Sequence, residues 1–250
     1  EVAQIGRNAR VAGTSRNTDF DRIPEDLHVD PRASYLHYTS NNTIYGTQYQ
    51  KAPVADVPLV CDASSDILSR PLDLDGHDVV FAGAQKNMGP AGVTLVIVRK
   101  ETLDRASANL PTMWRYKTHA EKGSMFNTPP VFAIYMVGLV IEWIMSQGSL
   151  EEMQERNRAK AGVIYDIVDG SDFYTCHAVP KSRSQMNISF RLPTPELDTM
   201  FVTESIEAGF RNLKGHRSMG GCRASVYNAM PMESVQALAE FMRTFQARRG

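Results

Sequence analysis

The chain has 250 residues, of which 42% are hydrophobic and 22% are charged. This length suits one large domain or one and a half ordinary ones, and the apolar fraction excludes a disordered or fibrous protein. The 27 lysines and arginines nearly balance the 28 acidic residues, so no nucleic-acid partner is expected. The three cysteines, Cys61, Cys176 and Cys222, are odd in number and far apart, which suits a reducing compartment and not a disulfide framework.

Targeting and membrane-spanning segments are not expected. The chain starts without a basic region or the apolar region of a signal peptide. Residues 1–5, followed by Gly6, read as the tail of a helix without its start, so we expect further residues to precede this sequence. The most apolar stretch, residues 131–145, is shorter than the roughly 20 residues that span a bilayer. It predicts a buried core helix or a subunit-interface helix in a cytoplasmic protein.

Short apolar runs in the first half of the chain predict a sheet. Candidate strands cover residues 35–38, 58–61, 79–82 and 93–98, and the last of these is the clearest. Runs that are apolar throughout indicate strands covered on both faces, as in a largely parallel α/β sheet. Function in such sheets gathers at the carboxyl ends of the strands. Asp62 and Lys86 both follow strands closely enough to lie there.

The second half predicts a smaller α+β unit. Ser149 and Glu152 form a capping-box pattern that opens a helix ending near Gly170. Thr194-Pro195 combines an N-cap residue with proline at the first helical position. The remaining expected elements are strands over residues 186–192 and 223–227, the continuation of the second helix to Gly209, and a last helix that reaches Arg249.

Lys86 is the most informative residue of the first half. It follows a short apolar strand and precedes a segment, residues 87–92, that is too rich in Gly and Pro to be helical. Burial at the edge of a sheet lowers the pKa of a lysine and frees its amine for Schiff-base chemistry. The alternative is a surface lysine in a turn. A phosphate-binding P-loop is excluded, because the lysine of a P-loop directly follows a glycine, whereas Lys86 precedes the glycines of its segment.

Asp62 ends an apolar strand 24 residues before Lys86. A carboxylate in that position suits the ring nitrogen of pyridoxal phosphate, because it keeps the pyridinium protonated and able to accept electrons. Asp62 alone is equally compatible with a helix N-cap or a metal ligand. The six histidines show no metal-binding spacing, so no metal site is expected.

Five blocks in chain order carry a resemblance to a known family. They cover residues 37–44, 62–71, 83–92, 123–130 and 215–225. These blocks resemble the phosphoserine aminotransferases, a family of fold-type I enzymes in the class-V aminotransferase group. The resemblance implies an α/β fold with a mostly parallel sheet in a large domain that binds pyridoxal phosphate, and a small α+β C-terminal domain. We place residues 1–147 in the remainder of the large domain and residues 148–250 in the small one.

By position, the resemblance implies roles for individual residues. Lys86 matches the lysine that binds the cofactor covalently, and Asp62 matches the partner of the ring nitrogen. Thr43 matches the hydroxyl that bonds to the phenolic oxygen of the cofactor, and Gln85 matches a contact to its phosphate. Asn127 and Thr128 match a pair that reaches the partner subunit's cofactor phosphate in a homodimer with shared active sites; the alternative for this pair is a helix cap.

The resemblance also implies how substrates bind. Arg223 matches the arginine that holds the α-carboxylate, and His216 with Arg217 matches the region for the distal anion. The substrates implied are glutamate and 2-oxoglutarate together with 3-phosphohydroxypyruvate and O-phospho-L-serine, in serine biosynthesis; 4-phosphohydroxy-L-threonine, in pyridoxine biosynthesis, stays open. Three further arginines match no motif and are expected to face solvent: Arg158, Arg183 and Arg211.

Two other functions remain open from the sequence. One is a different class-V enzyme, such as a serine–glyoxylate aminotransferase or a cysteine desulfurase, although no cysteine stands in a position typical of a desulfurase. The other is a non-catalytic chain, because family motifs that precede the matched blocks, among them a Gly-Arg phosphate turn, are not found here.

Overall fold

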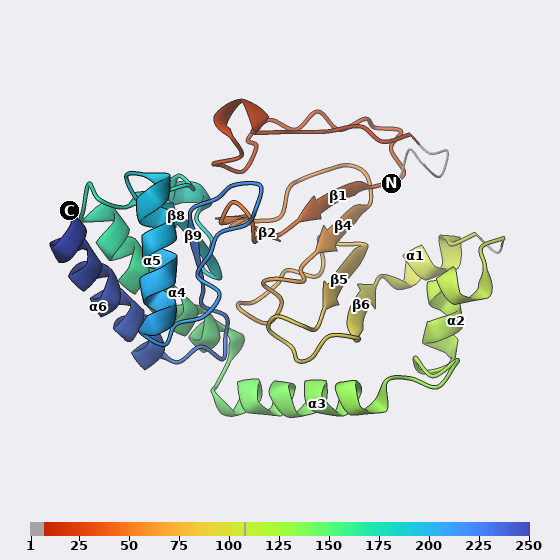
Figure 1. Cartoon of the computed structure of the whole chain (residues 1–250). Coiled ribbons are helices and arrows are strands. Elements are labelled where there is room, and N and C mark those ends of the chain that lie inside the picture. The colour runs from red at the N-terminus through yellow and green to blue at the C-terminus, as the bar shows by residue number, and fades with distance from the viewer. Residues whose placement is uncertain (1–7, 108) are drawn as a thin grey trace.

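The structure, a computed structural model, describes residues 8–107 and 109–250 (Figure 1). The helix tail expected at residues 1–5 lies outside the described residues. A four-stranded sheet and a three-stranded sheet with their surrounding segments form two units, which we call the four-stranded unit and the three-stranded unit. The helices of the three-stranded unit lie on the side of its sheet that faces away from the four-stranded sheet (Figure 1).

The four-stranded sheet confirms the strands expected in the first half. Its strands are β1 (Leu36–Thr39), β4 (Leu59–Asp62), β5 (Val79–Gly83) and β6 (Thr94–Val98), in the order β1-β4-β5-β6. The first three are parallel and β6 is antiparallel to β5. A small core of apolar side chains lies against this sheet, and among its members are Cys61, Val80, Ala82 and Met88. The parallel register brings the carboxyl ends of β1, β4 and β5 to one edge.

The burial expected for β6 is wrong. Thr94 and Leu95 are exposed, and the other three residues of the strand are only half-buried. β6 is the edge strand of the sheet, and none of the described strands pairs with its outer edge. An apolar, β-branched run therefore predicts the strand correctly but does not by itself say that both faces are covered.

The three-stranded unit matches the α+β pattern. Its antiparallel sheet has the order β7 (Thr175–Cys176), β8 (Asn187–Arg191), β9 (Cys222–Ser225), and its helices are α4 (Leu150–Asp169), α5 (Pro195–Glu207) and α6 (Met232–Arg249). The capping box is present, since the Ser149 hydroxyl accepts from the Glu152 N–H and the Glu152 carboxylate accepts from the Ser149 N–H at 2.7 Å. Thr194 likewise caps α5 through the Leu197 N–H.

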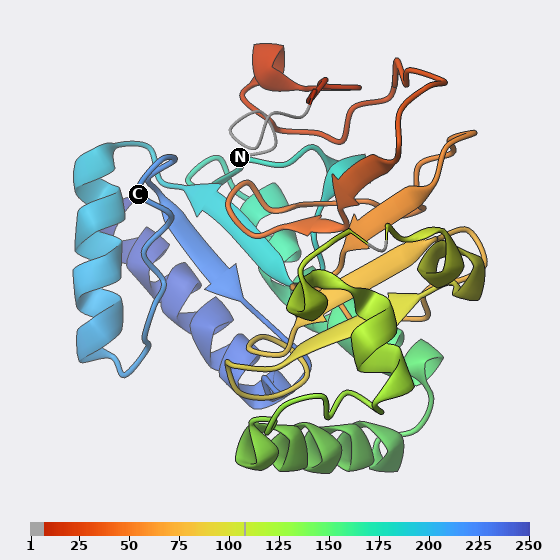
Figure 2. The same cartoon turned by 90° about the vertical axis from the view of Figure 1, so that its right-hand side faces the viewer.

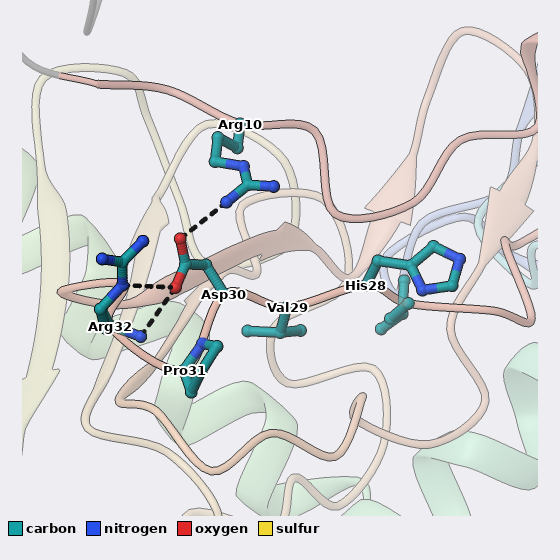
Figure 3. Close-up of a pocket in the computed structure, with 7 residues that line it drawn as sticks. Arg10, His28, Val29, Asp30, Pro31 and Arg32 are labelled. Carbon is teal, nitrogen blue, oxygen red and sulfur yellow. Dashed lines mark hydrogen bonds and ion pairs between the residues drawn. The ribbon is translucent and has the colours of Figure 1, made fainter.

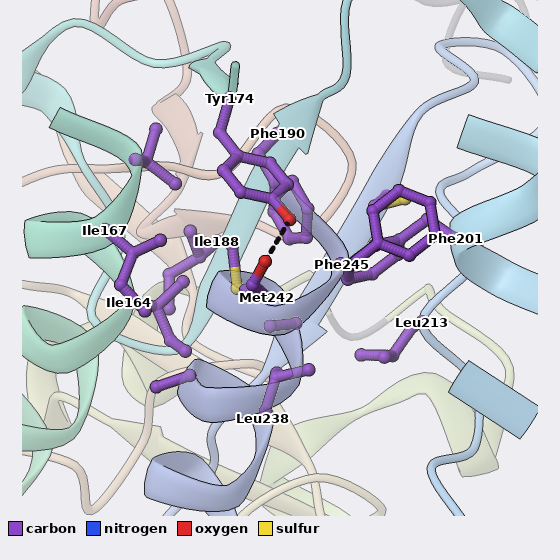
Figure 4. Close-up of a cluster of buried hydrophobic side chains, with 14 of the residues drawn as sticks. Ile164, Ile167, Tyr174, Ile188, Phe190, Phe201, Leu213, Leu238, Met242 and Phe245 are labelled. Atoms are coloured by element: carbon purple, nitrogen blue, oxygen red, sulfur yellow. Dashed lines mark hydrogen bonds between the residues drawn. The ribbon is translucent and has the colours of Figure 1, made fainter. Parts of the chain in front are cut away.

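Aromatic and aliphatic side chains fill the core between this sheet and its helices (Figure 4). Phe190, Phe201 and Phe245 are completely buried, and each such side chain contributes about 1.5–3 kcal/mol through removal of apolar surface from water. The Tyr174 hydroxyl donates to the Met242 carbonyl oxygen at 2.8 Å, so the polar group of this buried tyrosine is satisfied. This core fixes β8 and β9 in place.

The apolar segment at residues 131–145 forms helix α3 (Val131–Ser146), but it is not a core helix. Ile144 is its only buried residue among those described, whereas Phe132, Tyr135 and Met145 are largely exposed. α3 runs along one side of the molecule in both views (Figures 1 and 2). The core alternative is therefore wrong, and the interface alternative stays a prediction.

The remaining elements are short. They are β2 (Asn41–Asn42), β3 (Thr47–Gln48), α1 (Lys100–Arg105), α2 (Tyr116–Glu121), and the 3-10 turns Arg16–Thr18, Thr112–Trp114 and Pro180–Ser182. No single described helix is both long and apolar enough to cross a membrane; α3 and α4 reach that length and composition only as a pair, bent by 86° at the break between them.

Candidate active site

Lys86 lies in a turn that follows the carboxyl end of β5. The Met88 and Gly89 N–H groups both donate to the Ala84 carbonyl oxygen, at 3.1 and 2.8 Å, and close this turn. Lys86 is half-buried, and burial lowers the pKa of its amine; the charge of Asp62 opposes this effect and that of Arg223 adds to it. Lys86 does lie in a turn, as the surface alternative expected, but it is half-buried and not fully exposed, and its role as the cofactor lysine stays a prediction.

Asp62 is the last residue of β4, at the same edge of the sheet. Its Oδ1 accepts from the Ser64 N–H at 2.9 Å, so it caps a turn; no helix follows within the described residues up to β5, and the helix N-cap alternative is wrong. Among the described residues, no group of three or more His, Cys, Asp or Glu side chains is arranged to hold a metal ion.

Thr43 and Arg223 come from opposite ends of the sequence and meet in the fold. Arg223 lies on β9, and its Nη1 donates to the Thr43 carbonyl oxygen at 2.9 Å. The Nε of Arg223 is buried and has no hydrogen-bond partner among the described residues, which for a charged group is costly unless a ligand completes it. The Nη1 hydrogen bond joins Arg223 to Thr43, and Asp62 and Lys86 follow the neighbouring parallel strands β4 and β5 at one edge of the sheet. We call Thr43, Asp62, Lys86 and Arg223 the Lys86 cluster.

Other residues singled out from the sequence lie apart from this cluster. Gln85 is exposed and folds its amide back against Gly83. Asn127 and Thr128 are exposed, with one hydrogen bond between them, from Asn127 Nδ2 to the Thr128 carbonyl oxygen at 3.3 Å. The helix-cap alternative for this pair is wrong, because Pro130 is the N-cap of α3.

His216 and Arg217 lie in the loop between α5 and β9. His216 Nδ1 and Ser218 Oγ are 2.7 Å apart, and Arg217 is exposed. Within the described chain, neither side chain bonds to a residue of the Lys86 cluster. Their implied role at a distal anion therefore stays a prediction.

Arg183 was expected to face solvent, but it is half-buried in the structure. Its guanidinium makes two hydrogen bonds of 2.6 Å to the Asp169 carboxylate and lies over the Tyr165 ring, 4.5 Å from the centroid. No local sequence motif predicts these partners, because it is the fold that brings them to Arg183. Arg158 and Arg211 are exposed as expected.

Sequence reasoning missed a group of buried polar residues beneath the cluster. Ser40, Asn41, Gln48 and Asp66 are all nearly inaccessible to solvent. Asp66 accepts from Ser40 Oγ and from Gln48 Nε2, and burial raises the pKa of its carboxyl group. The available signal was the polar run that follows β1, because polar residues directly after a buried strand often line the functional edge of the sheet.

A separate hollow lies on the surface, lined by Arg10 and residues 27–32 (Figure 3). Asp30 pairs there with Arg10 at 2.7 Å and with Arg32 at 3.5 Å. This segment leads into the amino end of β1, opposite the end that meets Asp62, and none of the predicted site residues lines the hollow.

Comparison with known proteins identifies the family. The class-V aminotransferase family model matches residues 4–238. The chain belongs to this family. The matched region includes every residue of the Lys86 cluster, and the expected membership of the class-V group is confirmed.

Individual relatives match this chain over nearly its whole length. The phosphoserine aminotransferase of Desulfatibacillum aliphaticivorans is 52% identical over 100% of this chain and 70% of its own length. That of Halalkalibacterium halodurans is 51% identical over 98% of this chain and 69% of its own. The crystallised enzyme of Bacillus circulans subsp. alkalophilus is 48% identical, with a TM-score of 0.96 over 99% of this chain and 70% of its own length. The aminotransferase fold-type I assignment is confirmed.

Proposed function

We propose that this aminotransferase exchanges an amino group between glutamate and 3-phosphohydroxypyruvate, giving 2-oxoglutarate and O-phospho-L-serine, with pyridoxal phosphate as its cofactor. Curated relatives at 50–52% identity carry the name phosphoserine aminotransferase. A structure of the Trichomonas vaginalis enzyme, 35% identical, is described as pyridoxal phosphate-bound. The observation that carries the proposal is that the half-buried Lys86 and the carboxylate of Asp62 follow neighbouring parallel strands at one edge of the sheet, with Arg223 bonded to Thr43 on the adjoining hairpin.

The cluster fits pyridoxal phosphate. When bound, this cofactor supplies an electrophilic carbon for an amine and a ring that accepts electrons. The Lys86 amine makes no hydrogen bond within the described chain, and its lowered pKa favours the neutral, nucleophilic form. Asp62 has a carboxylate oxygen beyond the one that Ser64 occupies. The unpartnered Nε of Arg223 is available for an anion.

Each residue would then have a defined role. Lys86 would hold the cofactor through its amine, and, once the substrate amine has replaced it there, the same amine would accept and return the proton of the substrate Cα. Asp62 would keep the ring nitrogen protonated, and the Thr43 hydroxyl would hydrogen-bond to the phenolic oxygen of the cofactor. Arg223 binds the α-carboxylate of the substrate, because its planar guanidinium matches a carboxylate with two hydrogen bonds.

Further parts of the proposal rest on sequence position. Gln85 would contact the cofactor phosphate, and His216 and Arg217 would bind the phosphate of the substrate. The division into domains 1–147 and 148–250 is supported by the two separate apolar cores. A cytoplasmic location belongs to the same proposal.

Substrate competition tests the proposed reaction. With 2-oxoglutarate as acceptor, kcat/KM for O-phospho-L-serine should exceed that for L-serine or L-alanine by more than about 10²-fold, because a site with unpaired cationic groups rejects an analogue that lacks the anion. Replacing Arg217 with alanine should reduce this preference. Arg211→Ala is the matched control, since Arg211 is an exposed arginine that bonds only to nearby carbonyl oxygens in the described chain. A preference for serine with glyoxylate would instead indicate the serine–glyoxylate type.

We also propose a homodimer in which each chain lends Asn127 and Thr128 to the partner's site. α3 exposes a row of large apolar side chains directly after this pair, and such a surface is typical of an interface. The pair is exposed and contacts none of the Lys86 cluster in its own described chain. A two-fold interface centred on α3 would bring each pair to the other chain's Lys86.

Hybrid dimers test this sharing. Chains with Lys86→Ala are co-expressed with chains carrying Asn127→Ala and Thr128→Ala. If the pair serves the other chain, each hybrid has one site with both lesions and one intact site, so random pairing should restore about a quarter of wild-type activity. The matched control combines Lys86→Ala with Asp62→Ala chains, whose hybrids contain no intact site. If tagged hybrids form and no activity returns, the pair acts within its own chain and sharing is wrong.

A further inference from the structure

Asn41 on β2 connects the four-stranded unit to the three-stranded unit. Its side chain is 1% exposed. Nδ2 donates to Ser65 Oγ at 2.8 Å, in the loop after β4, and to Asn187 Oδ1 at 2.9 Å, on β8. Oδ1 accepts from Ser184 Oγ, which belongs to the three-stranded unit. One buried amide therefore bonds to both units at once.

Gln48 on β3 repeats this arrangement. It is the Cα partner of Asn41 in the β2–β3 hairpin and is equally buried. Nε2 donates to Asp66 Oδ2 at 3.0 Å in the four-stranded unit, and Oε1 accepts from the Gln185 N–H at 3.0 Å in the three-stranded unit. Two facing amides therefore fix the hairpin to both units.

The β2–β3 hairpin contains Thr43 and is hydrogen-bonded, directly or through Ser40 at its base, to Arg223 and Asp62. At its base, the Ser40 N–H donates to the Asp62 carbonyl oxygen at 3.0 Å. At its tip, Thr43 lies in the turn and its carbonyl oxygen accepts from Arg223 Nη1 at 2.9 Å. A shift of the hairpin would therefore move the ring-nitrogen carboxylate, the cofactor hydroxyl and the substrate arginine relative to each other.

The tip of the hairpin is seated tightly on β8. Gly46 has φ +71° and its N–H donates to the Asn42 carbonyl oxygen at 3.0 Å. A Cβ at this position would lie 2.9 Å from the Asn187 carbonyl oxygen, closer than real Cβ atoms approach. The turn has no room to tilt toward β8, and its tip also accepts hydrogen bonds from the Ser184 N–H and from Ser189 Oγ, at 2.9 and 3.1 Å. The two facing amides of β2 and β3 fix the base of the hairpin, where it meets the four-stranded unit.

We propose that Asn41 and Gln48 are positioning residues, which set Thr43 and Arg223 relative to Asp62 and thereby the affinity for the cofactor and for the carboxylate of the substrate. This inference rests on the proposed function. The amides act through the hairpin and touch neither the cofactor nor the substrate. Removing one leaves its buried partners unpaired, so the hairpin takes up new contacts and Arg223 loses its orientation.

The test compares three variants of the protein loaded with pyridoxal phosphate. Asn41→Ala and Gln48→Ala should each raise the dissociation constant of the cofactor and KM for O-phospho-L-serine about tenfold, with kcat within about threefold, because binding geometry is lost and the reacting groups stay. Asn157→Ala is the matched control. Asn157 is also a buried amide, and its Nδ2 donates to Asn228 Oδ1 at 2.9 Å and to the Ser69 carbonyl oxygen at 3.0 Å without contacting the hairpin.

The outcomes separate the two proposals. If wild-type protein binds the cofactor but does not transfer the amino group of phosphoserine, the proposed function is wrong, and the cofactor dissociation constants still test the positioning role. If Asn41→Ala and Gln48→Ala lower only the unfolding midpoint, as Asn157→Ala should, the positioning role is wrong. Should either variant fail to fold, Ser65→Ala removes a single partner of Asn41 and should raise both constants about threefold; unchanged constants there would also overturn the role.

Discussion

Replacing Lys86 with alanine is expected to lower the rate of amino transfer by more than about 10³-fold, because one side chain supplies both the nucleophile and the proton carrier. The variant should also lose the visible absorbance band that a cofactor bound covalently to lysine gives. Burial, the largest effect, and Arg223 lower the pKa of Lys86, and Asp62 raises it; the net lowering makes the amine easier to deprotonate than that of a lysine in water. Steady-state kinetics and an absorbance spectrum of the purified, cofactor-loaded variant measure both effects.

Lys160 provides the control for this experiment. Lys160 is buried, and burial lowers its pKa to about 8. Its amine donates to the carbonyl oxygens of Tyr227 and Asn228, so its hydrogen bonds are already made within the chain. Lys160→Met should reduce the stability of the fold and leave the absorbance band in place. Retention of the band or of turnover in Lys86→Ala would contradict the assignment of Lys86.

Features with a local signal in the sequence were predictable. The capping box at Ser149 and the N-cap at Thr194 depend on residues three apart, and both helices begin where these patterns place them. The strands β4 and β5 follow from short apolar runs, and the parallel arrangement follows from their burial. Asp62 and Lys86 lie together because the carboxyl ends of parallel strands share one edge.

Features that depend on distant contacts were not predictable in the same way. The hydrogen bond between Asn41 and Asn187 joins residues 146 positions apart, and no periodicity in the sequence records it. Arg183 looked like an ordinary surface arginine until the fold brought Asp169 and Tyr165 to it. The apolar composition of α3 predicted a covered helix, but the chain's own core does not cover it, since only Ile144 is buried among its described residues; composition carries no information on which surface would do so.

Replacing Asp62 with asparagine is the second change with a large expected effect. The asparagine carbonyl oxygen can still accept from the Ser64 N–H, which now bonds to Oδ1, so the turn should persist. The negative charge that holds a proton on the ring nitrogen is lost, and kcat should fall by about 10²–10³-fold, as for removal of one preorganised electrostatic group. Covalent binding of the cofactor at Lys86 should remain detectable by its absorbance.

Asp62→Asn should also lower the pKa of the Lys86 amine. Asp62 stabilises the protonated amine and raises its pKa, so in cofactor-free protein Asp62→Asn should lower that pKa further, and amine-specific labelling of Lys86 should begin at a lower pH. Asp66→Asn should shift it in the same direction by a smaller amount, because the influence of Asp66 on Lys86 is weaker than that of Asp62. A labelling profile that moved equally in both variants would show that Asp62 has no special proximity to Lys86. A normal kcat in Asp62→Asn would remove its role at the ring nitrogen.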